Sequence, residues 1–293
     1  MDADSSRPAA NPSAAMSSTA LPNDLADPSA LHSQGQPNSR LLPEDPAYPL
    51  VATLPPPSGA RANALAALPL SPSTDKGGRA FCFRLDATHG NARASTMSTA
   101  WGLVTTPRFM PVGTRGPVKL LTIDQVRATG AQIVLTHTYH MAIHPGIETV
   151  EALGGLHCFT GWTHGPILTD SGGFQVYSLE DSRLIDDAGV TFRSPRSGAP
   201  IRFTPTETVD WQRRMGSDFI MQLDECAPWP CTRDEAERAM RRSLDWARRA
   251  MDVPVGPHQI VLPIVQGSVF PELRHESTCR LLELDARAYA IGG

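Results

Sequence analysis

Short apolar segments and capped helical segments alternate through residues 80–293, and this alternation restricts the fold more than any other feature of the sequence. Strands are predicted at residues 81–85, 132–136, 166–169, 218–223, 259–265 and 288–291. Helices are predicted at residues 122–129, 148–153, 204–215, 232–251 and 271–284, and a hairpin at residues 181–202. Thr122 with Gln125, Thr204 with Glu207, and Thr232 with Glu235 have the spacing of capping boxes, and Pro205 stands at the first position of its helix. Strands and helices in such alternation are typical of a parallel sheet.

Polar or glycine residues follow the predicted strands where each one ends. These residues are His137, Asp170, Asp224, Gln266 and Gly293. In a (β/α)8 barrel the carboxyl ends of the strands converge on one face, where the active site lies. A doubly wound sheet would also bind ligands at strand ends, but the glycine fingerprint of a dinucleotide site is missing. We therefore predict an α/β protein with a (β/α)8 TIM-type barrel with insertions, incomplete in this chain.

Residues 1–79 differ in composition from the rest of the chain. They hold 13 of the 27 prolines, mixed with Ser, Ala and Asn. Such a segment cannot bury enough apolar surface to offset the entropy of ordering it. We expect a disordered Pro/Ser/Ala-rich tail at 1–79 and the ordered part of the chain at 80–293. Asp2 and Asp4 argue against a mitochondrial-type leader, although organellar targeting by the tail stays open.

Composition excludes several classes of protein. The net charge of −4 argues against a globally basic nucleic-acid binder. Five scattered cysteines contain no C-x-x-C pair, so neither a zinc site nor a disulfide framework is predicted, and a reducing compartment, the cytoplasm, is expected. No apolar run approaches the roughly 20 residues that span a bilayer, so no membrane association is expected.

The strand end at Asp170 has the residues of a binding pocket for a flat ring. Asp170 and Asp224 can accept hydrogen bonds from ring N–H and amino groups, whereas Gln266 and a glycine N–H can donate to a carbonyl oxygen. Gly172 and Gly173 permit a sharp turn and a close approach, and Phe174 can stack on a ring. The set suits a nucleobase, although a sugar or an amino acid would also fit such polarity. Taken singly, Asp170 would be an ordinary turn residue.

Several motifs, in order, resemble the tRNA-guanine transglycosylase family, also called queuine tRNA-ribosyltransferases. They are Phe109-Met110-Pro111-Val112-Gly113-Thr114, Thr138-Tyr139-His140, Asp170-Ser171-Gly172-Gly173-Phe174-Gln175, Asp224-Glu225-Cys226 and Val265-Gln266-Gly267-Ser268. The resemblance runs from about Phe81 to Gly293 and is to the bacterial-type catalytic subunit. It implies an irregular (β/α)8 barrel that exchanges the wobble guanine of certain tRNAs for a 7-deazaguanine base. A flipped anticodon base, an aspartate nucleophile and a covalent tRNA-enzyme intermediate are implied.

The resemblance also implies roles for individual residues. Asp170 is the general acid/base that contacts the base. The base-binding residues are Ser171, Gly172, Gly173, Phe174, Asp224, Gln266 and Gly293. Of these, Asp224 and Gln266 read the base edge, Gly293 lends a backbone group and Phe174 stacks on the ring. Ser171 lies beside Asp170 and orients it.

Three departures from the family pattern stand out. The family nucleophile, in a D-x-x-x-P-T-R stretch, and the zinc site, C-x-C-x-x-C with a later His, have no match up to Gly293. The expected zinc ligands therefore lie beyond Gly293, with no metal site in this chain, and residues 80–293 form the N-terminal part of a barrel that lacks its last strands and zinc subdomain. We expect the 293-residue chain alone to be unstable or aggregated and inactive, the product of a truncated gene model. His137 replaces the usual Asn, and Cys226 favours the 7-aminomethyl precursor base over queuine.

Partners follow from the implied reaction. A tRNA anticodon arm needs basic contacts, for which Arg213, Arg214 and the arginine-rich helix at 233–249 are candidates. Intrahelical ion pairs such as Glu237 with Arg241 are the alternative role for these arginines. A homodimer or heterodimer is expected at full length. Two other functions stay open, namely a non-catalytic subunit of the same fold and an unrelated barrel enzyme that acts on free nucleobases.

Overall fold

A parallel β-sheet lies at the centre of the computed structural model, which describes residues 81–179 and 183–293. Its five strands follow the spatial order β11-β10-β6-β5-β4. They are β4 (Val112–Gly113), β5 (Val134–His137), β6 (Ile167–Asp170), β10 (Phe219–Met221) and β11 (Ile260–Leu262). All four neighbouring pairs are parallel, and the register places His137 opposite Asp170. The polar ends of β5 and β6 therefore lie side by side.

A second parallel pair continues the fold beyond β11. It joins β12 (Ile264–Val265) to β13 (Ala290–Ile291). The single strand predicted at residues 259–265 is thus divided in two at Pro263, which has no N–H to donate to a neighbouring strand. Gln266 follows β12 directly, and Gly292 and Gly293 follow β13. Three strand ends from distant parts of the sequence, those of β6, β12 and β13, therefore carry residues of the predicted site.

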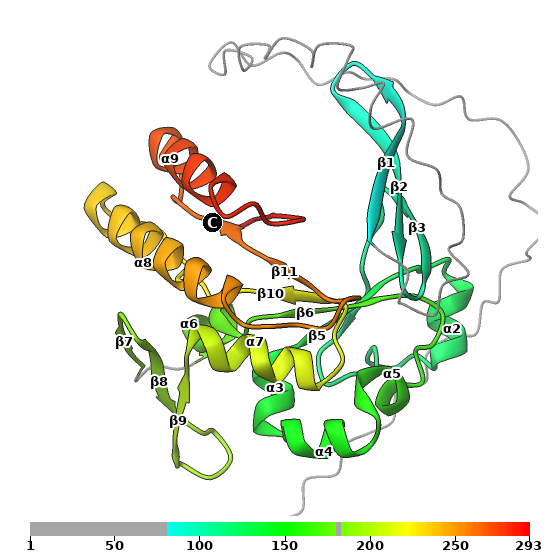
Figure 1. The fold of residues 1–293 in the computed structure, drawn as a ribbon. Helices are drawn as coiled ribbons and strands as arrows, with labels where there is room; N and C mark the ends of the chain where they lie inside the picture. The colour runs from blue at the N-terminus through cyan, green and yellow to red at the C-terminus, as the bar shows by residue number, and fades with distance from the viewer. Residues whose placement is uncertain (1–80, 180–182) are drawn as a thin grey trace, which may run out of the picture. The chain divides into compact units, whose positions relative to one another are not determined.

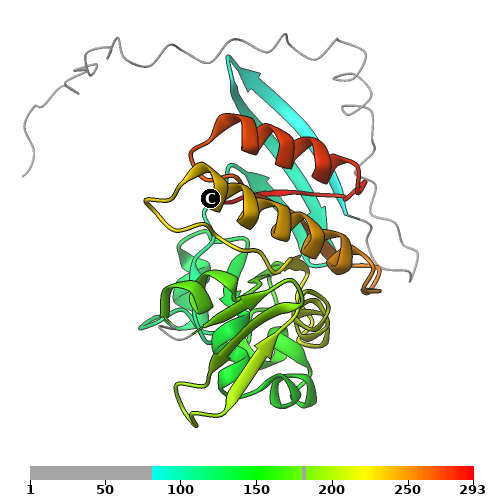
Figure 2. The ribbon, with the colours of Figure 1, turned by 90° about the vertical axis from the view of Figure 1, so that its left-hand side faces the viewer.

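Helices cover the sheet. They are α2 (Ile123–Ala128), α3 (Thr138–Ile143), α4 (Ile147–Ala152), α5 (Gly155–Thr160), α6 (Gly173–Leu179), α7 (Pro205–Arg214), α8 (Arg233–Met251) and α9 (Pro271–Leu282). Helices α8 and α9 run side by side and pack on β12, whereas α3, α4, α5 and α7 gather on another side (Figure 1; Figure 2). The capping boxes predicted at Thr122 and Thr232 are formed. The one predicted at Thr204 is formed only in part: Thr204 accepts from the N–H of Glu207, but the Glu207 carboxylate meets the Thr204 hydroxyl at 2.8 Å rather than the backbone N–H. Pro205 lies in the first turn of α7, as predicted.

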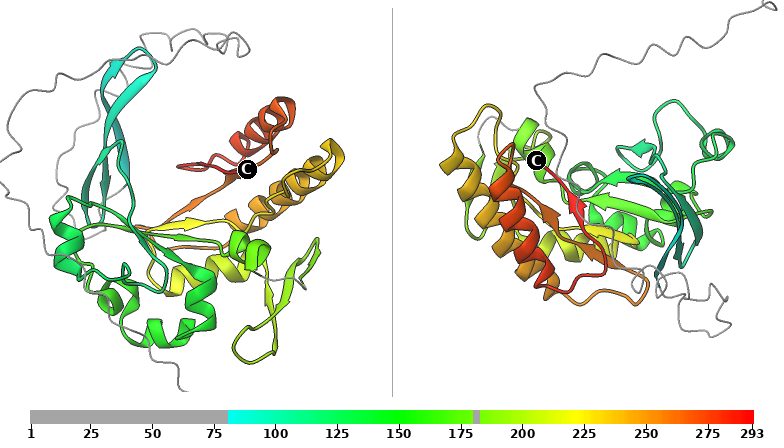
Figure 3. Two further views of the ribbon diagram at one scale, coloured as in Figure 1. Left: turned by 180° about the vertical axis from the view of Figure 1, so that it is seen from behind. Right: turned by 90° about the horizontal axis from the view of Figure 1, so that it is seen from above.

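Two antiparallel sheets flank the parallel one. The first contains β1 (Cys82–His89), β2 (Ala92–Thr99) and β3 (Gly102–Thr106), and the second contains β7 (Leu184–Asp186), β8 (Gly189–Arg193) and β9 (Pro200–Phe203). Figure 3 shows the two sheets standing apart, on either side of the central strands. The first sheet packs Val104 against Phe219 and Ile260 of the parallel sheet. The hairpin predicted at 181–202 is, in its described part, a three-stranded sheet.

The described core consists of several apolar clusters rather than one. The largest joins β5 and β6 to helices α2–α5 through side chains such as Val134, Ile167 and the fully buried Trp162. A second cluster packs Phe192 and Phe203 of the β7–β9 sheet against Trp246 of α8. A third holds α8 and α9 on β12. The strand ends that carry the polar residues are therefore backed by packed helices.

The prediction of an α/β fold with a parallel sheet is confirmed. The described residues do not close a barrel, so the predicted (β/α)8 architecture is not shown. Three short helices were missed, α3, α5 and α6, because each has six or seven residues and no capping box in its sequence. The tail predicted at residues 1–79 lies outside the described residues.

Candidate functional site

Asp170 ends strand β6, and the turn that follows needs glycine. Gly172 has a φ of +81°, and a Cβ on it would lie 2.8 Å from a ring carbon of Phe203 and 3.0 Å from the backbone nitrogen of Tyr139. A Cβ on Gly173 would lie 2.7 Å from the carbonyl oxygen of Asp224. Contacts this close exclude larger side chains. The two glycines thus let the β6 turn approach both α3 and the segment after β10.

The carboxylate of Asp170 accepts three hydrogen bonds and contacts the ring of His137. Its Oδ1 accepts from the backbone N–H groups of Thr138 at 3.0 Å and Gly172 at 3.1 Å. Its Oδ2 accepts from Nε2 of Gln175 at 2.9 Å and contacts Nδ1 of His137. A carboxylate has about four acceptor positions, and these four contacts surround both oxygens. This network holds Asp170 at the strand end.

Asp224 lies three residues beyond β10 and is bound by two side chains. Gln266 donates from Nε2 to Oδ2 of Asp224 at 2.6 Å, and Ser171 donates from Oγ to Oδ1 at 3.3 Å. Ser171 Oγ also accepts from the N–H of Gly173 at 3.1 Å. Ser171 therefore connects the Asp170 turn to the second carboxylate, Asp224.

Asp224 has a strongly perturbed acidity. Burial of the carboxyl group raises the pKa of Asp224 to about 6, although part of the residue faces a cavity. The negative charge of Asp170 adds to this rise, whereas the hydrogen bonds from Gln266 and Ser171 oppose it. A carboxyl group that changes charge near neutral pH inside a cavity is a common feature of functional sites.

A cavity of about 270 Å³ lies between these strand ends. Besides apolar residues, it is lined by Asp170, Ser171, Gly172, Phe174, Gln175, Asp224, Cys226, Gln266, Gly292 and Gly293. The ring of Phe174 is 60% exposed, so its face is free to pack on a ligand, whereas Gln266 is 2% exposed. The predicted site residues Asp170, Ser171, Gly172, Phe174, Asp224, Gln266 and Gly293 are thus brought together. Gly173 lines the smaller pocket described below rather than this cavity.

The sequence prediction assigned no role to several cavity residues. Gln175 lines the cavity beside Cys226, for which a base preference was predicted, and Met221, Ile264, Ala290 and Ile291 supply apolar walls. The feature that could have identified Gln175 as a site residue is its position in the first turn of α6, five residues after Asp170. The Oε1 atom of Gln175 is buried and has no hydrogen-bond partner within residues 81–179 and 183–293.

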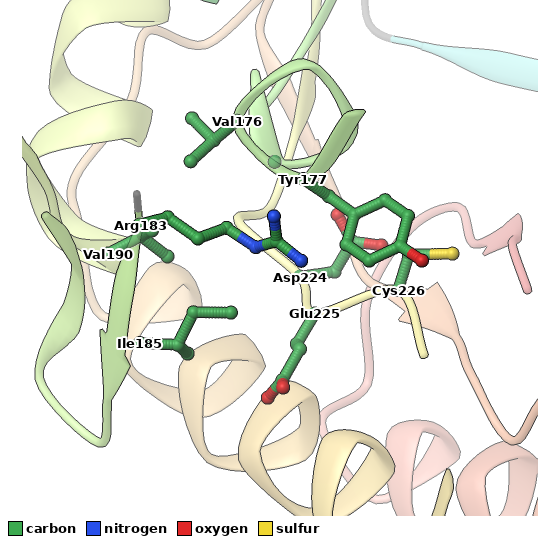
Figure 4. A pocket seen from close by; sticks show the side chains of 9 residues that line it. Val176, Tyr177, Arg183, Ile185, Val190, Asp224, Glu225 and Cys226 are labelled. Carbon is green, nitrogen blue, oxygen red and sulfur yellow. The ribbon is translucent and has the colours of Figure 1, made fainter. Parts of the chain in front are cut away.

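A smaller pocket of about 10 Å³ adjoins the cavity, and both share Asp224 and Cys226. Figure 4 shows the Arg183 side chain reaching toward Tyr177, above Glu225. The guanidinium carbon of Arg183 lies 4.6 Å from the centre of the Tyr177 ring, a cation–π distance. Burial raises the pKa of the Cys226 thiol, so this thiol stays protonated and uncharged. The pocket holds at most about one water molecule.

Within the described ranges, no three His, Cys, Asp or Glu side chains gather closely enough to hold a metal ion. The zinc implied by the resemblance has no donor set among these residues. No helix in the described part of the chain is both long enough and apolar enough to cross a membrane.

Fold and site together define an α/β protein with an acidic cavity at the carboxyl ends of parallel strands, where α/β enzymes bind their ligands. Comparison with known families makes this more specific, because the family model "Queuine tRNA-ribosyltransferase" matches residues 86–293. The chain belongs to the queuine tRNA-ribosyltransferase family. The resemblance stated from its motifs is therefore confirmed, and an unrelated barrel enzyme is excluded.

Curated relatives named queuine tRNA-ribosyltransferase support the same assignment. The relative from Gloeobacter violaceus is 49% identical over 213 residues, which covers 73% of this chain and 56% of that protein. The relative from Rhizobium meliloti is 49% identical over 215 residues, covering 73% and 57%. A relative from Thermus thermophilus is 46% identical over 213 residues, covering 73% and 55%. The chain thus spans a little over half the length of these relatives.

Proposed function

We propose that the protein exchanges the wobble guanine of a tRNA anticodon for a 7-deazaguanine base, and that the 270 Å³ cavity holds the base. One observation carries this proposal. Within the segment matched by the family model, the hydrogen bonds Ser171–Asp224–Gln266 place a carboxylate and an amide side by side, next to Asp170.

The pair Asp224 and Gln266 has the polarity that guanine requires. The guanine edge presents two donors, N1–H and the 2-amino group, beside one acceptor, O6. The carboxylate of Asp224 can accept both donors, and the amide of Gln266 has a second N–H for O6 besides the one directed at Asp224. The 7-deazaguanine bases share this edge, so one site can hold both the leaving and the incoming base.

Asp170 is proposed as the general acid/base of the exchange. It lines the same cavity, and it precedes Ser171 in the chain, whose hydroxyl donates to Asp224. Phe174 would stack on the base, because its ring is exposed beside the cavity. Gly293, at the end of β13, would offer a backbone group to the base. Cys226 supports a preference for the 7-aminomethyl precursor base over queuine, because its uncharged thiol lines the wall of the 270 Å³ cavity.

The finer architecture remains part of the proposal. We expect the parallel strands β4, β5, β6, β10, β11 and β13 to belong to a (β/α)8 barrel. The D-x-x-x-P-T-R stretch that carries the family nucleophile is not among the 293 residues. The 293-residue polypeptide alone is therefore expected not to exchange bases, whereas a longer protein with that stretch, its zinc subdomain and a partner subunit would.

Arginines of α7 and α8 are the proposed contacts to the tRNA phosphates. Most of them pair with carboxylates, for example Arg213 with Asp210 and Arg214 with Glu151, both at 2.6 Å. The ion pair expected between Glu237 and Arg241 is present, also at 2.6 Å. Such exposed pairs contribute only about 0–1 kcal/mol, so a phosphate can replace the carboxylate at little cost. The ion pairs thus do not prevent these arginines from contacting tRNA.

Incorporation of radiolabelled guanine into tRNA tests the proposal. The protein is assayed in the length in which its cell produces it, beside the 293-residue chain and the variants Asp170→Asn and Asp224→Asn. We expect exchange by the native form, at least a hundredfold loss in each variant, and none by the 293-residue chain. Absence of exchange by the native form would refute the function, and exchange by the 293-residue chain would refute its expected inactivity.

A further inference from the structure

Arg274 connects two of the strand ends that carry cavity residues. It lies near the start of α9, and it is half-buried. Its Nη1 donates to the carbonyl oxygen of Gly292, directly after β13, at 2.9 Å, and to that of Ser268, in the turn after β12, at 3.4 Å. Gly292 lines the 270 Å³ cavity, whereas Arg274 is not among the described residues that line it. The guanidinium thus holds the cavity wall from outside.

Packing of α9 fixes where the Arg274 side chain starts. The backbone N–H of Arg274 donates to the carbonyl oxygen of Phe270 at 3.1 Å, within the first turn of the helix. A Cβ on Gly267 would lie 2.7 Å from the same nitrogen, so the turn after β12 packs directly on α9. Ser277, three residues further along and on the same face, accepts from the N–H of Gln266 at 3.1 Å. One face of α9 therefore holds the ends of β12 and β13.

Gly292 and Gly293 leave no room for a side chain between Gln266 and Arg274. A Cβ on Gly292 would lie 2.8 Å from Nε2 of Gln266. A Cβ on Gly293, whose φ is +105°, would lie 2.6 Å from Nη1 of Arg274. The N–H of Gly292 donates to the carbonyl oxygen of Val265 at 3.0 Å. Both backbone groups of Gly292 are thus held, the N–H by β12 and the carbonyl by Arg274.

The direction of the next N–H follows from the peptide plane. The bond between Gly292 and Gly293 is trans, and in a trans peptide the C=O and the N–H point in opposite directions. Because Arg274 binds the carbonyl of Gly292, the N–H of Gly293 points away from the guanidinium. A charged donor on the carbonyl also polarises the peptide, and this strengthens its N–H as a donor.

We propose that Arg274 is a positioning residue that aims the N–H of Gly293 into the cavity, at the carbonyl oxygen of the bound base. This inference rests on the proposed function, because it takes guanine or a 7-deazaguanine base as the ligand. The oxygen O6 has two lone pairs, so it accepts from Gly293 as well as from Gln266. Without Arg274 the glycine peptide, which has no side chain to restrain it, leaves this orientation.

The analogue 6-thioguanine tests this role, because it changes only the atom to which the N–H of Gly293 is assigned. Sulfur accepts hydrogen bonds weakly, whereas N1–H and the 2-amino group remain for Asp224. Equilibrium dialysis of radiolabelled guanine, with 6-thioguanine as competitor, gives both dissociation constants for the protein in its native length. The variants are Arg274→Met, which removes the charge, and Arg280→Met, the same change at an exposed position of α9.

We expect the wild type and Arg280→Met to bind guanine more tightly than 6-thioguanine. In Arg274→Met the affinity for guanine should fall about tenfold and that for 6-thioguanine about threefold or less, so the preference for guanine shrinks. Arg274→Lys keeps the charge on a more flexible side chain, and its preference should lie between those of the wild type and Arg274→Met. If Arg274→Met does not fold, the comparison is made with Arg274→Lys.

The preference for guanine over 6-thioguanine separates positioning from a merely structural role. A variant of Arg274 that keeps the preference of the wild type, whether or not both affinities fall together, would overturn the positioning role alone. Absence of guanine binding by the wild type would overturn the proposed function and, with it, this inference.

Discussion

Gln266 donates a 2.6 Å hydrogen bond to Asp224 across 42 residues of sequence, and this contact joins the segment after β10 to the end of β12. The acceptor is a carboxylate whose pKa is raised to about 6 by burial, and Gln266 is the stronger of the two side-chain donors that oppose this rise. The pair is thus both a structural connection and the proposed reader of the base edge. Removal of the Gln266 side chain should therefore change both the affinity of the cavity for the base and the pKa of Asp224.

Gln266→Ala is expected to weaken guanine binding by about 10- to 100-fold, because a hydrogen bond to a charged group contributes about 1.5–3 kcal/mol. The same change should raise the pKa of Asp224 further, since it removes a donor that favours the charged form. Equilibrium dialysis across a pH series measures both effects. Thr278→Ala, an exposed change on α9, is the control and should leave affinity unchanged. Unaltered affinity in Gln266→Ala would exclude a role in reading the base.

Asp224 should make the protein less stable at neutral than at mildly acid pH. Its folded pKa of about 6 exceeds the ordinary value of 3.8, so the folded state holds the proton more tightly than the unfolded state. The resulting penalty is absent below about pH 3.8, grows between 3.8 and 6, and is complete above 6.

Urea unfolding of wild type and Asp224→Asn from pH 4 to 7.5 tests this sign. We expect the free energy of unfolding of the variant, relative to wild type, to rise by about 1–3 kcal/mol as pH increases to 6, and then to level off. Carboxylates with lowered pKa values, such as Glu237, follow the opposite trend and are the same in both proteins. A difference independent of pH would show that Asp224 is not perturbed.

Gly173→Ala should disturb the cavity through the backbone of Asp224. The added Cβ would lie 2.7 Å from the Asp224 carbonyl oxygen, so the segment after β10 must shift. We expect a stability loss of about 1–3 kcal/mol and at least a tenfold loss of guanine affinity. Gly198→Ala is the control, because its Cβ meets nothing within 4 Å, and its φ of +69° costs only about 1 kcal/mol. Equal affinity in the two variants would contradict this prediction.

A buried pair far from the cavity should contribute strongly to stability. Asp218 Oδ2 contacts Nε2 of His157 at 2.9 Å and accepts from the N–H of Ile167 at 2.8 Å, while Nδ1 of His157 lies 2.7 Å from the carbonyl oxygen of Trp162. Asp218→Ala is expected to cost about 3–5 kcal/mol, because it leaves buried groups without partners.

The exposed pair Asp210–Arg213 offers the matched control for Asp218. Asp210→Ala removes an ion pair of 2.6 Å on the surface of α7 and should cost less than about 1 kcal/mol. Urea unfolding of both variants gives the comparison. Similar losses of stability in Asp218→Ala and Asp210→Ala would mean that burial does not determine how much the His157–Asp218 pair contributes to stability.

Local features of the fold were predicted from sequence with good accuracy. Thr122 and Thr232 cap helices where their capping boxes indicated, because a capping box joins residues only three positions apart. Asp170 ends β6 and Gln266 follows β12 directly, as expected from the apolar runs that precede them. The short helix α3 was missed, since a six-residue segment without a capping signal owes its helical form to its packing.

The sequence by itself determined the alternation of elements, the polar strand ends and the family, because these depend on residues close together in the chain and on ordered motifs. Only the tertiary structure decided which polar residues meet. The contact of His137 with Asp170 joins residues 33 positions apart and depends on the register of β5 against β6. The acidity of Asp224 depends on burial between separate strand ends. Contacts and burial of this kind arise only when strands and helices pack, so no local pattern encodes them.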